Sequence, residues 1–340
     1  MKKIIIGREL PGYPYNLKAR LTRCLVAVRR ELARRFGIGS RSYVSLKIAM
    51  SGQAANDLLR SMLLAPAPCL IARFGTGELE ATLRGLYSRM KGSALSKTLK
   101  LLTGEIGPFW WDNSIRAGLC WNAGFFPPTD EALNAFSRRV CEDAMQIDVL
   151  GAHSPGETEI CGSNATIKAV PLVDLEPFFF ERPWMGALRG MKVLAVHPFS
   201  DTIQAQYGKR HLLFKDSEML PDFDLETYRT ISSFAGNKVP YKTWFDALDK
   251  MCEDIAKIDF DVAIIGCGAY GMSIGAFVKR ELGRKAVHLG GMTQLLFGIK
   301  GGRWDNIPKY GNDLYNEHWA RPFDSDRVSQ VNTIEGGCYW

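Results

Sequence analysis

Two segments far apart in the chain combine a short apolar run with glycines and chemically useful side chains. The first reads CLIARFGTGE over residues 69–78, and the second reads DVAIIGCGAYG over residues 261–271. Each pattern predicts a short buried strand that stops at glycines and leads into a helix. In open parallel α/β sheets, ligands bind where the carboxyl ends of strands meet such loops. The two segments together predict a site for a ligand of the nucleotide type.

The second segment matches the pattern G-x-G-x-x-G between a predicted strand and a predicted helix. In that context the glycines let the backbone approach a phosphate, and the helix N-terminus stabilises its charge. We expect Gly266, Gly268, Tyr270 and Gly271 to contact a nucleotide; the alternative is tight packing of strand against helix. A nicotinamide site also needs an acid at the end of the next strand. The next predicted strand, 286–290, is followed by a further glycine and no acid, which disfavours a hydride-transferring dehydrogenase.

The first segment places a cation and a carboxylate around two glycines. Arg73 at a strand end can pair bidentately with a phosphate. We therefore expect Arg73, Gly75, Thr76 and Gly77 to contact the ligand, and Glu78 to hold a divalent metal, a ribose or an acceptor hydroxyl. The alternative is that Arg73 and Glu78 pair with each other or with structural partners.

A third strand end, with the sequence HPFSD at 197–201, adds further polar groups to the same predicted edge. His197 or Asp201 could orient an acceptor hydroxyl or act as a general base. The alternative is an ordinary helix start, with Ser200 or Asp201 as the N-cap.

The 340 residues alternate between strand and helix signals and predict an α/β fold with a mostly parallel, Rossmann-like sheet and helices on both faces. Strands are expected at 69–73, 147–151, 193–197, 262–266 and 286–290. Helices are expected at 77–86, 129–146, 201–214, 243–258 and 272–282. The predicted organisation is a basic helical arm over 1–55, an α/β domain over 56–300 with possible halves 56–185 and 191–300, and an aromatic-rich tail over 301–340 that packs on the domain.

The positive charge is concentrated at the N-terminus. Residues 1–50 hold twelve Lys and Arg against two acids, whereas the whole chain has a net charge of +7. Apolar residues recur at helical spacing over 21–32, and arginines occupy much of the remaining surface. Such a cationic amphipathic helix can lie on an anionic membrane surface. The alternative is a helix packed on the domain with a solvated basic face, and no motif for nucleic acid accompanies the charge.

Cysteine usage and hydropathy indicate the compartment. The eight cysteines are scattered and form no C-x-x-C pair, which favours reduced thiols. The opening residues lack the apolar stretch of a secretory signal, and no apolar run reaches the roughly 20 residues that a membrane helix needs. We expect a cytoplasmic protein, with the basic arm allowing a peripheral position on the inner face of the membrane.

The loop at 73–78 resembles the R-F-G-D-G-E loop of the GT-D-type glycosyltransferases. Other stretches are similar to GT-D-like proteins of bacterial surface-polysaccharide clusters, and the similarity covers about residues 60–340. These stretches are VLAVHPFSDTI at 193–203, GCGAYG at 266–271, HLGGMTQLLFGI at 288–299 and GCYW at 337–340. The resemblance implies a Rossmann-like domain that binds a nucleotide sugar, with an Asp-x-Glu pair on the loop engaging the metal and the donor.

One residue departs from that pattern. Thr76 stands where the family's acidic pair begins with aspartate, so Glu78 alone carries over as a possible Mn²⁺ or Mg²⁺ ligand. Threonine is a poor ligand for these ions beside a carboxylate. Arg73, or Lys209 and Arg210, would then neutralise the leaving diphosphate.

The resemblance implies a glycosyltransferase that moves a sugar from a nucleotide-sugar donor to a glycan or lipid-linked acceptor in surface-polysaccharide synthesis. Glu78, His197 and Asp201 are the expected catalytic residues. The first alternative is a non-catalytic nucleotide- or glycan-binding protein with a degenerate site, which Thr76 favours. The second is a nicotinamide-dependent oxidoreductase.

Overall fold

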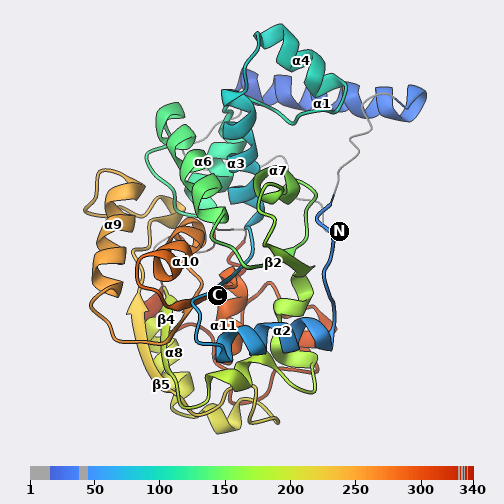
Figure 1. Cartoon of the computed structure of the whole chain (residues 1–340). Helices are drawn as coiled ribbons and strands as arrows, with labels where there is room; N and C mark the ends of the chain where they lie inside the picture. Colours follow the sequence, from blue (N-terminus) through green and yellow to red (C-terminus); the bar gives the residue numbers. More distant parts are fainter. Residues whose placement is uncertain (1–15, 38–44, 328–329, 331, 333, 335) are drawn as a thin grey trace.

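The computed structural model describes residues 16–37, 45–327, 330, 332, 334 and 336–340 (Figure 1). These residues form a seven-stranded sheet in the order β3-β2-β1-β7-β6-β4-β5, and every pair of neighbours is parallel. The predicted α/β class is therefore confirmed. The strands are β1 (Leu70–Ala72), β2 (Val149–Ala152), β3 (Lys168–Pro171), β4 (Lys192–His197), β5 (Asp224–Arg229), β6 (Val262–Ile265) and β7 (Lys285–His288).

Helices cover both faces because the central strands are apolar on both sides. All four residues of β6 are fully buried, as expected for a strand in the middle of a covered parallel sheet. One face packs against α3 (Thr76–Arg89), α6 (Asp130–Ala144), α9 (Trp244–Ile255) and α10 (Gly271–Arg280). The other face packs against α2 (Gln53–Leu64), α8 (Ser200–Tyr207) and α11 (Thr293–Leu296). Shorter helices are α5 (Asn113–Arg116), α7 (Glu157–Cys161) and α12 (Pro308–Gly311).

The order of the strands creates a switch point between β1 and its neighbour β7. The chain leaves β1 into α3, whose Leu79 and Ala81 pack on one face of the sheet. It leaves β7 into α11, whose Leu295 and Leu296 pack on the opposite face. Because the two connections diverge, a crevice opens between them at the carboxyl edge of the sheet, where doubly wound folds bind ligands.

The five predicted strands are confirmed, but β3 and β5 were missed. These two strands form the edges of the sheet, and β5 is largely exposed with mixed polar residues. The helix predicted over 201–214 was too long, because α8 ends at Tyr207 before Gly208 and a 3₁₀ turn follows at Arg210–Leu212.

The basic helix α1 (Leu17–Phe36) packs against α4 (Ala94–Leu102) and α5, and the pair α1–α4 forms one end of the molecule (Figure 1). Buried polar contacts attach it. The Thr22 hydroxyl donates to Asp112 Oδ2 at 2.9 Å, and Trp110 Nε1 donates to Thr22 Oγ1 at 2.8 Å. The part of the predicted arm at 1–15 and 38–44 lies outside the described residues, and its boundary at residue 55 falls inside α2.

Described residues of the aromatic tail contribute to the core. Trp304, Tyr310 and Trp319 are buried against the sheet face that carries α2, α8 and α11. In the described ranges, no helix is both long and apolar enough to cross a membrane.

Candidate functional site

A cleft of about 940 Å³ lies at the carboxyl edge of the sheet. It is lined by the loops that follow four adjacent strands, β1, β7, β6 and β4. The two glycine-bearing junctions therefore meet in one cleft, as the sequence predicts. Parts of α1 and of the aromatic tail complete its walls. The lining residues from the four strand ends include Arg73, Gly75, Thr76, Gly77, Glu78, His197, Gly266, Gly268, His288, Gly290 and Gly291.

Arg73 is the cation closest to the switch point. It follows β1 directly, and its guanidinium lies beside Gly290, where an added Cβ would be 3.2 Å from Nη1. Its Nε is buried without a hydrogen-bond partner, so Glu78 does not satisfy it. Burial lowers the pKa of Arg73, against the opposing effect of the Glu78 charge. A buried donor on a cation without an acceptor is costly, which indicates a place for an anionic ligand.

The first turn of α3 adds further donors beside Arg73. The helix begins at Thr76, and its N-cap Gly75 offers no side-chain acceptor to the first amides. The Glu78 carboxylate folds back over Gly75 so closely that a side chain at position 75 would overlap it. A helix N-terminus carries a partial positive charge that attracts anions. Glu78 thus stabilises this end of the helix and also reaches the cleft.

Among the described residues, the cleft brings together few of the ligands that Mn²⁺ or Mg²⁺ prefers. Nowhere in the described ranges do three His, Cys, Asp or Glu side chains gather closely enough to hold an ion. Thr76 is exposed and brings no carboxylate, and Glu80 is in an ion pair of 2.9 Å with Arg84. Hard divalent cations need several oxygen ligands. A metal held by Glu78 would therefore need further ligands from the phosphates of a bound substrate.

The glycine-rich segment divides its residues between the cleft and the core. Gly266 lines the cleft, and an added Cβ there would lie 2.6 Å from the Gly290 carbonyl oxygen. Gly268 also lines it, with a φ of 59° that favours glycine. An added Cβ at Gly268 would lie 2.7 Å from the Ala123 carbonyl oxygen.

The other half of the motif does not reach the cleft, contrary to expectation. The Tyr270 ring stacks on Trp244 with centroids 5.1 Å apart, and its hydroxyl lies 3.0 Å from Ser233 Oγ. Gly271 lies against the His288 ring, which a side chain would overlap. Strand–helix packing, the alternative weighed for the whole motif, describes these two residues.

His197 lines the cleft in its neutral form. Its Nδ1 accepts a hydrogen bond of 3.0 Å from the Phe199 amide, and burial lowers its pKa to about 3. Because Nδ1 is an acceptor, the single proton lies on Nε2. His197 can therefore donate a hydrogen bond from Nε2 to a ligand. It does not have a free nitrogen to act as the expected general base.

His288 has the opposite arrangement and was not singled out as a site residue from the sequence. Its Nδ1 lies 3.3 Å from the Ile265 carbonyl oxygen, to which it must donate. Burial and the nearby Arg73 charge lower its pKa to about 4. Nε2 therefore carries a lone pair at neutral pH. The signal in the sequence was its place at a strand end before two glycines, the same signal that identified Arg73.

The two histidines predict a pH dependence of stability. Both folded pKa values lie below the ordinary histidine value of 6.5, so the unfolded chain takes up protons first as the pH falls. The contribution of these two histidines to the free energy of unfolding is therefore fully present above pH 6.5, and it decreases toward pH 4. We expect a loss of about 1 kcal/mol for each histidine between pH 6.5 and 5.5. Urea unfolding across this range measures it.

Asparagine at these positions separates the effect from general acid sensitivity. His197→Asn can still accept from the Phe199 amide and His288→Asn can still donate to Ile265, but neither titrates. The double variant should show a flatter dependence of the free energy of unfolding on pH, and His211→Asn, at an exposed position outside the cleft, is the matched control substitution. If the free energy of unfolding of the double variant depends on pH as steeply as that of the native protein, the lowered pKa values of His197 and His288 do not cause the pH dependence.

Asp201 lies outside the cleft, contrary to the expected catalytic role. Its carboxylate pairs with Arg229 at 2.6 Å and accepts from the Ser325 hydroxyl at 2.8 Å, and these contacts lower its pKa. Arg229 also pairs with Asp326 at 2.9 Å. Asp201, at the start of α8, therefore links this helix to Arg229 of β5 and to Ser325 of the tail. Its side chain points toward the tail and not toward the strand ends of the cleft. Arg210 does not line the cleft either and pairs with Asp222 at 2.6 Å.

Tertiary contacts add cleft residues that local patterns did not indicate. They come from α1, from the 108–123 segment and from the tail, and they make the lining predominantly cationic. Five arginines face two glutamates there: Arg23, Arg30, Arg73, Arg84 and Arg303 against Glu78 and Glu80. Tyr339 and Trp340 form an aromatic wall, with Arg303 placed 4.7 Å from the centroid of the Tyr339 ring. This composition favours an anionic ligand that carries a planar or ring-shaped group.

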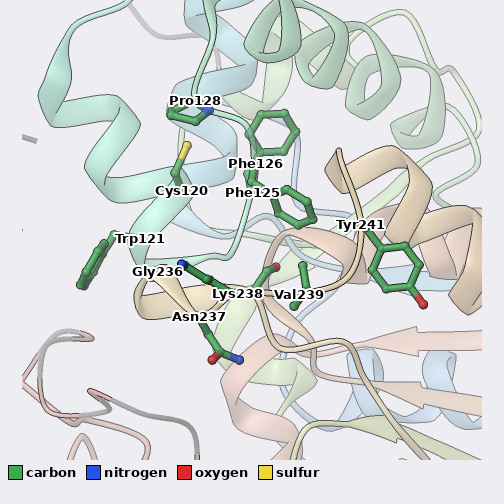
Figure 2. Close-up of a pocket in the computed structure, with 11 residues that line it drawn as sticks. Cys120, Trp121, Phe125, Phe126, Pro128, Gly236, Asn237, Lys238, Val239 and Tyr241 are labelled. Carbon is green, nitrogen blue, oxygen red and sulfur yellow. The ribbon is translucent and has the colours of Figure 1, made fainter. Parts of the chain in front are cut away.

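A second, smaller cavity of about 490 Å³ adjoins the cleft, and Figure 2 shows Trp121 and Tyr241 at opposite sides of it. Phe125 and Phe126 lie between them. Consecutive residues divide the two spaces, because Trp121 lines the cavity and Asn122 lines the cleft. Its lining is mainly apolar, so the arginine-rich cleft is the better place for phosphate.

Comparison with known proteins identifies no relative: no protein-family model, no curated protein and no solved structure matches the chain.

Proposed function

We propose that the protein is a glycosyltransferase that binds a nucleotide sugar in the switch-point cleft. The observation that carries this proposal is the buried, unpartnered Nε of Arg73 at the β1–β7 crevice. Its neighbours are the first turn of α3, where the N-cap Gly75 has no side chain to accept from the amides, and the close-packed glycines Gly266 and Gly290. Together they form a site for phosphate oxygens. A cleft of about 940 Å³ is large enough for a nucleotide with an attached sugar.

In the proposed complex, the donor's diphosphate lies between Arg73 and the first turn of α3. The acceptor is a glycan or a lipid-linked sugar. Its hydroxyl oxygen forms a new bond to the anomeric carbon, while the bond from that carbon to the diphosphate breaks. The hydroxyl proton passes to the Glu78 carboxylate, and Arg73 neutralises the charge that develops on the leaving diphosphate. His197 Nε2 donates to an oxygen of the donor, and the Tyr339–Trp340 wall packs against its base or sugar.

A thermal-shift panel tests the proposal. Nucleotide sugars and nucleoside diphosphates should raise the unfolding temperature without Mn²⁺, because arginines rather than a metal hold the diphosphate. Glu78→Gln should leave this shift in place but abolish sugar transfer. NADH serves as the comparison ligand, since a shift with NADH alone would favour an oxidoreductase. The absence of a shift with every nucleotide would contradict the proposal.

A second candidate function is a binding protein without turnover. It is favoured by the single carboxylate at Glu78, where a metal-dependent transferase needs a pair. We expect Thr76→Asp to create a Mn²⁺ site of millimolar to micromolar affinity, because position 76 is exposed at the start of α3 beside Glu78. Isothermal titration with Mn²⁺ measures this.

Transfer assays on the same variant distinguish the two candidates, with Thr76→Asn as the neutral control. Sugar transfer by the native chain, without added metal, supports the transferase. Transfer by Thr76→Asp alone, and only with Mn²⁺, would show that the native protein binds its ligand without turnover.

A further inference from the structure

Exposed apolar side chains gather on the two helices at one end of the molecule. Six of the fourteen large apolar residues that are exposed in the described ranges lie on α1 and α4, helices of 20 and 9 residues. Leu17 and Leu95 are the most exposed of these, at 78% and 71%. We call this surface the apolar band; its members are Leu17, Leu21, Cys24 and Val28 of α1 and Leu95 and Leu99 of α4, and Cys24 is likewise exposed.

The band follows from helical spacing. Leu17, Leu21, Cys24 and Val28 succeed one another every three or four residues and so share one face of α1. Leu25, on the adjoining face, packs with Leu101 of α4 in a small separate core. Helix α4 lies beside α1 (Figure 1). It adds its own exposed pair to the band, Leu95 and Leu99, which are four residues apart. Large apolar side chains that gather on the surface of a folded protein indicate an interaction site.

The charge around the band is almost entirely positive. Helix α1 has seven Lys and Arg and a single acid, Glu31, and α4 has two lysines and no acid. Glu31 is itself in ion pairs with Arg34 and Arg35. A second copy of this surface would be repelled by its own charge. Anionic lipid headgroups around an apolar interior complement both features.

We propose that the apolar band docks the protein on an anionic bilayer, with α1 lying in the plane of the interface. The cleft lies on a different face of the same helix: Ala19, Arg23, Val26 and Arg30 of α1 line it. A docked α1 therefore holds the cleft on the far side of this helix, one helix diameter, or about 10 Å, from the membrane surface. Docking itself is independent of the proposed transferase activity. With that activity, it favours an acceptor carried on a lipid over a free glycan.

Vesicle co-sedimentation with the full chain tests docking. Vesicles of phosphatidylcholine with phosphatidylglycerol should bind the protein, while phosphatidylcholine alone and high salt should not. The double variant Leu21→Glu/Leu99→Glu should bind the vesicles at least about tenfold more weakly than the native protein. It loses two apolar contacts with the bilayer and adds two negative charges that the anionic lipids repel. Leu64→Glu is the matched control, since Leu64 is an exposed leucine on α2, away from the band (Figure 1).

A second measurement reports the orientation. Among the described cysteines Cys24 is the exposed one, so an environment-sensitive dye attached to it marks the band. Its emission should shift to shorter wavelength on the anionic vesicles, and Cys24→Ser corrects for labelling elsewhere. Equal vesicle binding by native and double variant, or binding without a shift, would overturn the proposal. So would a native dimer that Leu21→Glu/Leu99→Glu separates, since a second copy would then cover the band.

Nucleotide thermal shifts on the double variant keep the two proposals separate. An unchanged unfolding temperature and an unchanged nucleotide shift show that the fold and the cleft are intact while docking is lost. A native protein that docks on vesicles but shows no nucleotide shift would leave the docking proposal standing and reject the transferase.

Discussion

Arg73→Met should weaken binding of a nucleoside diphosphate by about a hundredfold, because a charge-assisted hydrogen bond contributes roughly 1.5–3 kcal/mol. The same change should leave the ligand-free protein equally stable, or more stable by about 1 kcal/mol. The reason is that Nε of Arg73 is buried without a hydrogen-bond partner among the described residues, so this donor is unsatisfied in the free protein. Such opposite effects on binding and stability are typical of residues placed for a ligand.

Isothermal titration and urea unfolding measure the two quantities on one sample. Arg73→Lys, which keeps the charge but not the planar fork, should recover part of the affinity. If Arg73→Met unfolds more readily and still binds the nucleotide with native affinity, Arg73 is a structural residue and the anion site lies elsewhere.

Arg84→Met should destabilise the protein by about 3–5 kcal/mol, although Arg84 also lines the cleft. Its Nη1 donates to Asp112 Oδ2 at 2.6 Å, and the Asp112 side chain is fully buried. Without the guanidinium, a buried carboxylate loses its counter-charge. The same oxygen accepts from Thr22, so the attachment of α1 to the domain should loosen as well.

The pH dependence of this effect follows from Asp112. Burial on its own would raise the pKa of the carboxyl, but Arg84 and the hydrogen bonds from Ser114 and Ile115 outweigh it, and the folded pKa is lowered. The pair therefore contributes stability above the unfolded pKa of about 3.9, and this contribution is lost as the pH falls through the lower folded value. In Arg84→Met the deficit should shrink in acid, where Asp112 becomes neutral.

Urea unfolding measures the stability, and limited proteolysis at α1 measures the loosening. Arg84→Met/Asp112→Asn provides the control, since asparagine keeps an acceptor for the Ser114 and Ile115 amides but carries no charge. It should be more stable than Arg84→Met alone. Equal stability of native protein and Arg84→Met would show that the ion pair contributes nothing measurable.

The sequence by itself determined the central sheet and the strand ends of the site. Runs such as Val262–Ile265 are apolar at every position because the strand is buried on both faces. A continuous apolar run is visible in the sequence itself, so these strands could be predicted. Arg73 and Gly266 follow such runs directly, and parallel strands end at one edge. The edge strand at Asp224–Arg229 was not predicted, because its residues are partly or fully exposed and do not form a continuous apolar run.

Tertiary structure alone decided which side chains face the cleft. Tyr270 and Asp201 stand next to cleft residues in the chain, yet the stacking on Trp244 and the ion pair with Arg229 turn them elsewhere. Arg23 and Trp340 reach the cleft from the two ends of the described chain. The direction of a side chain depends on contacts between residues remote in sequence, and spacing along the chain does not encode those contacts.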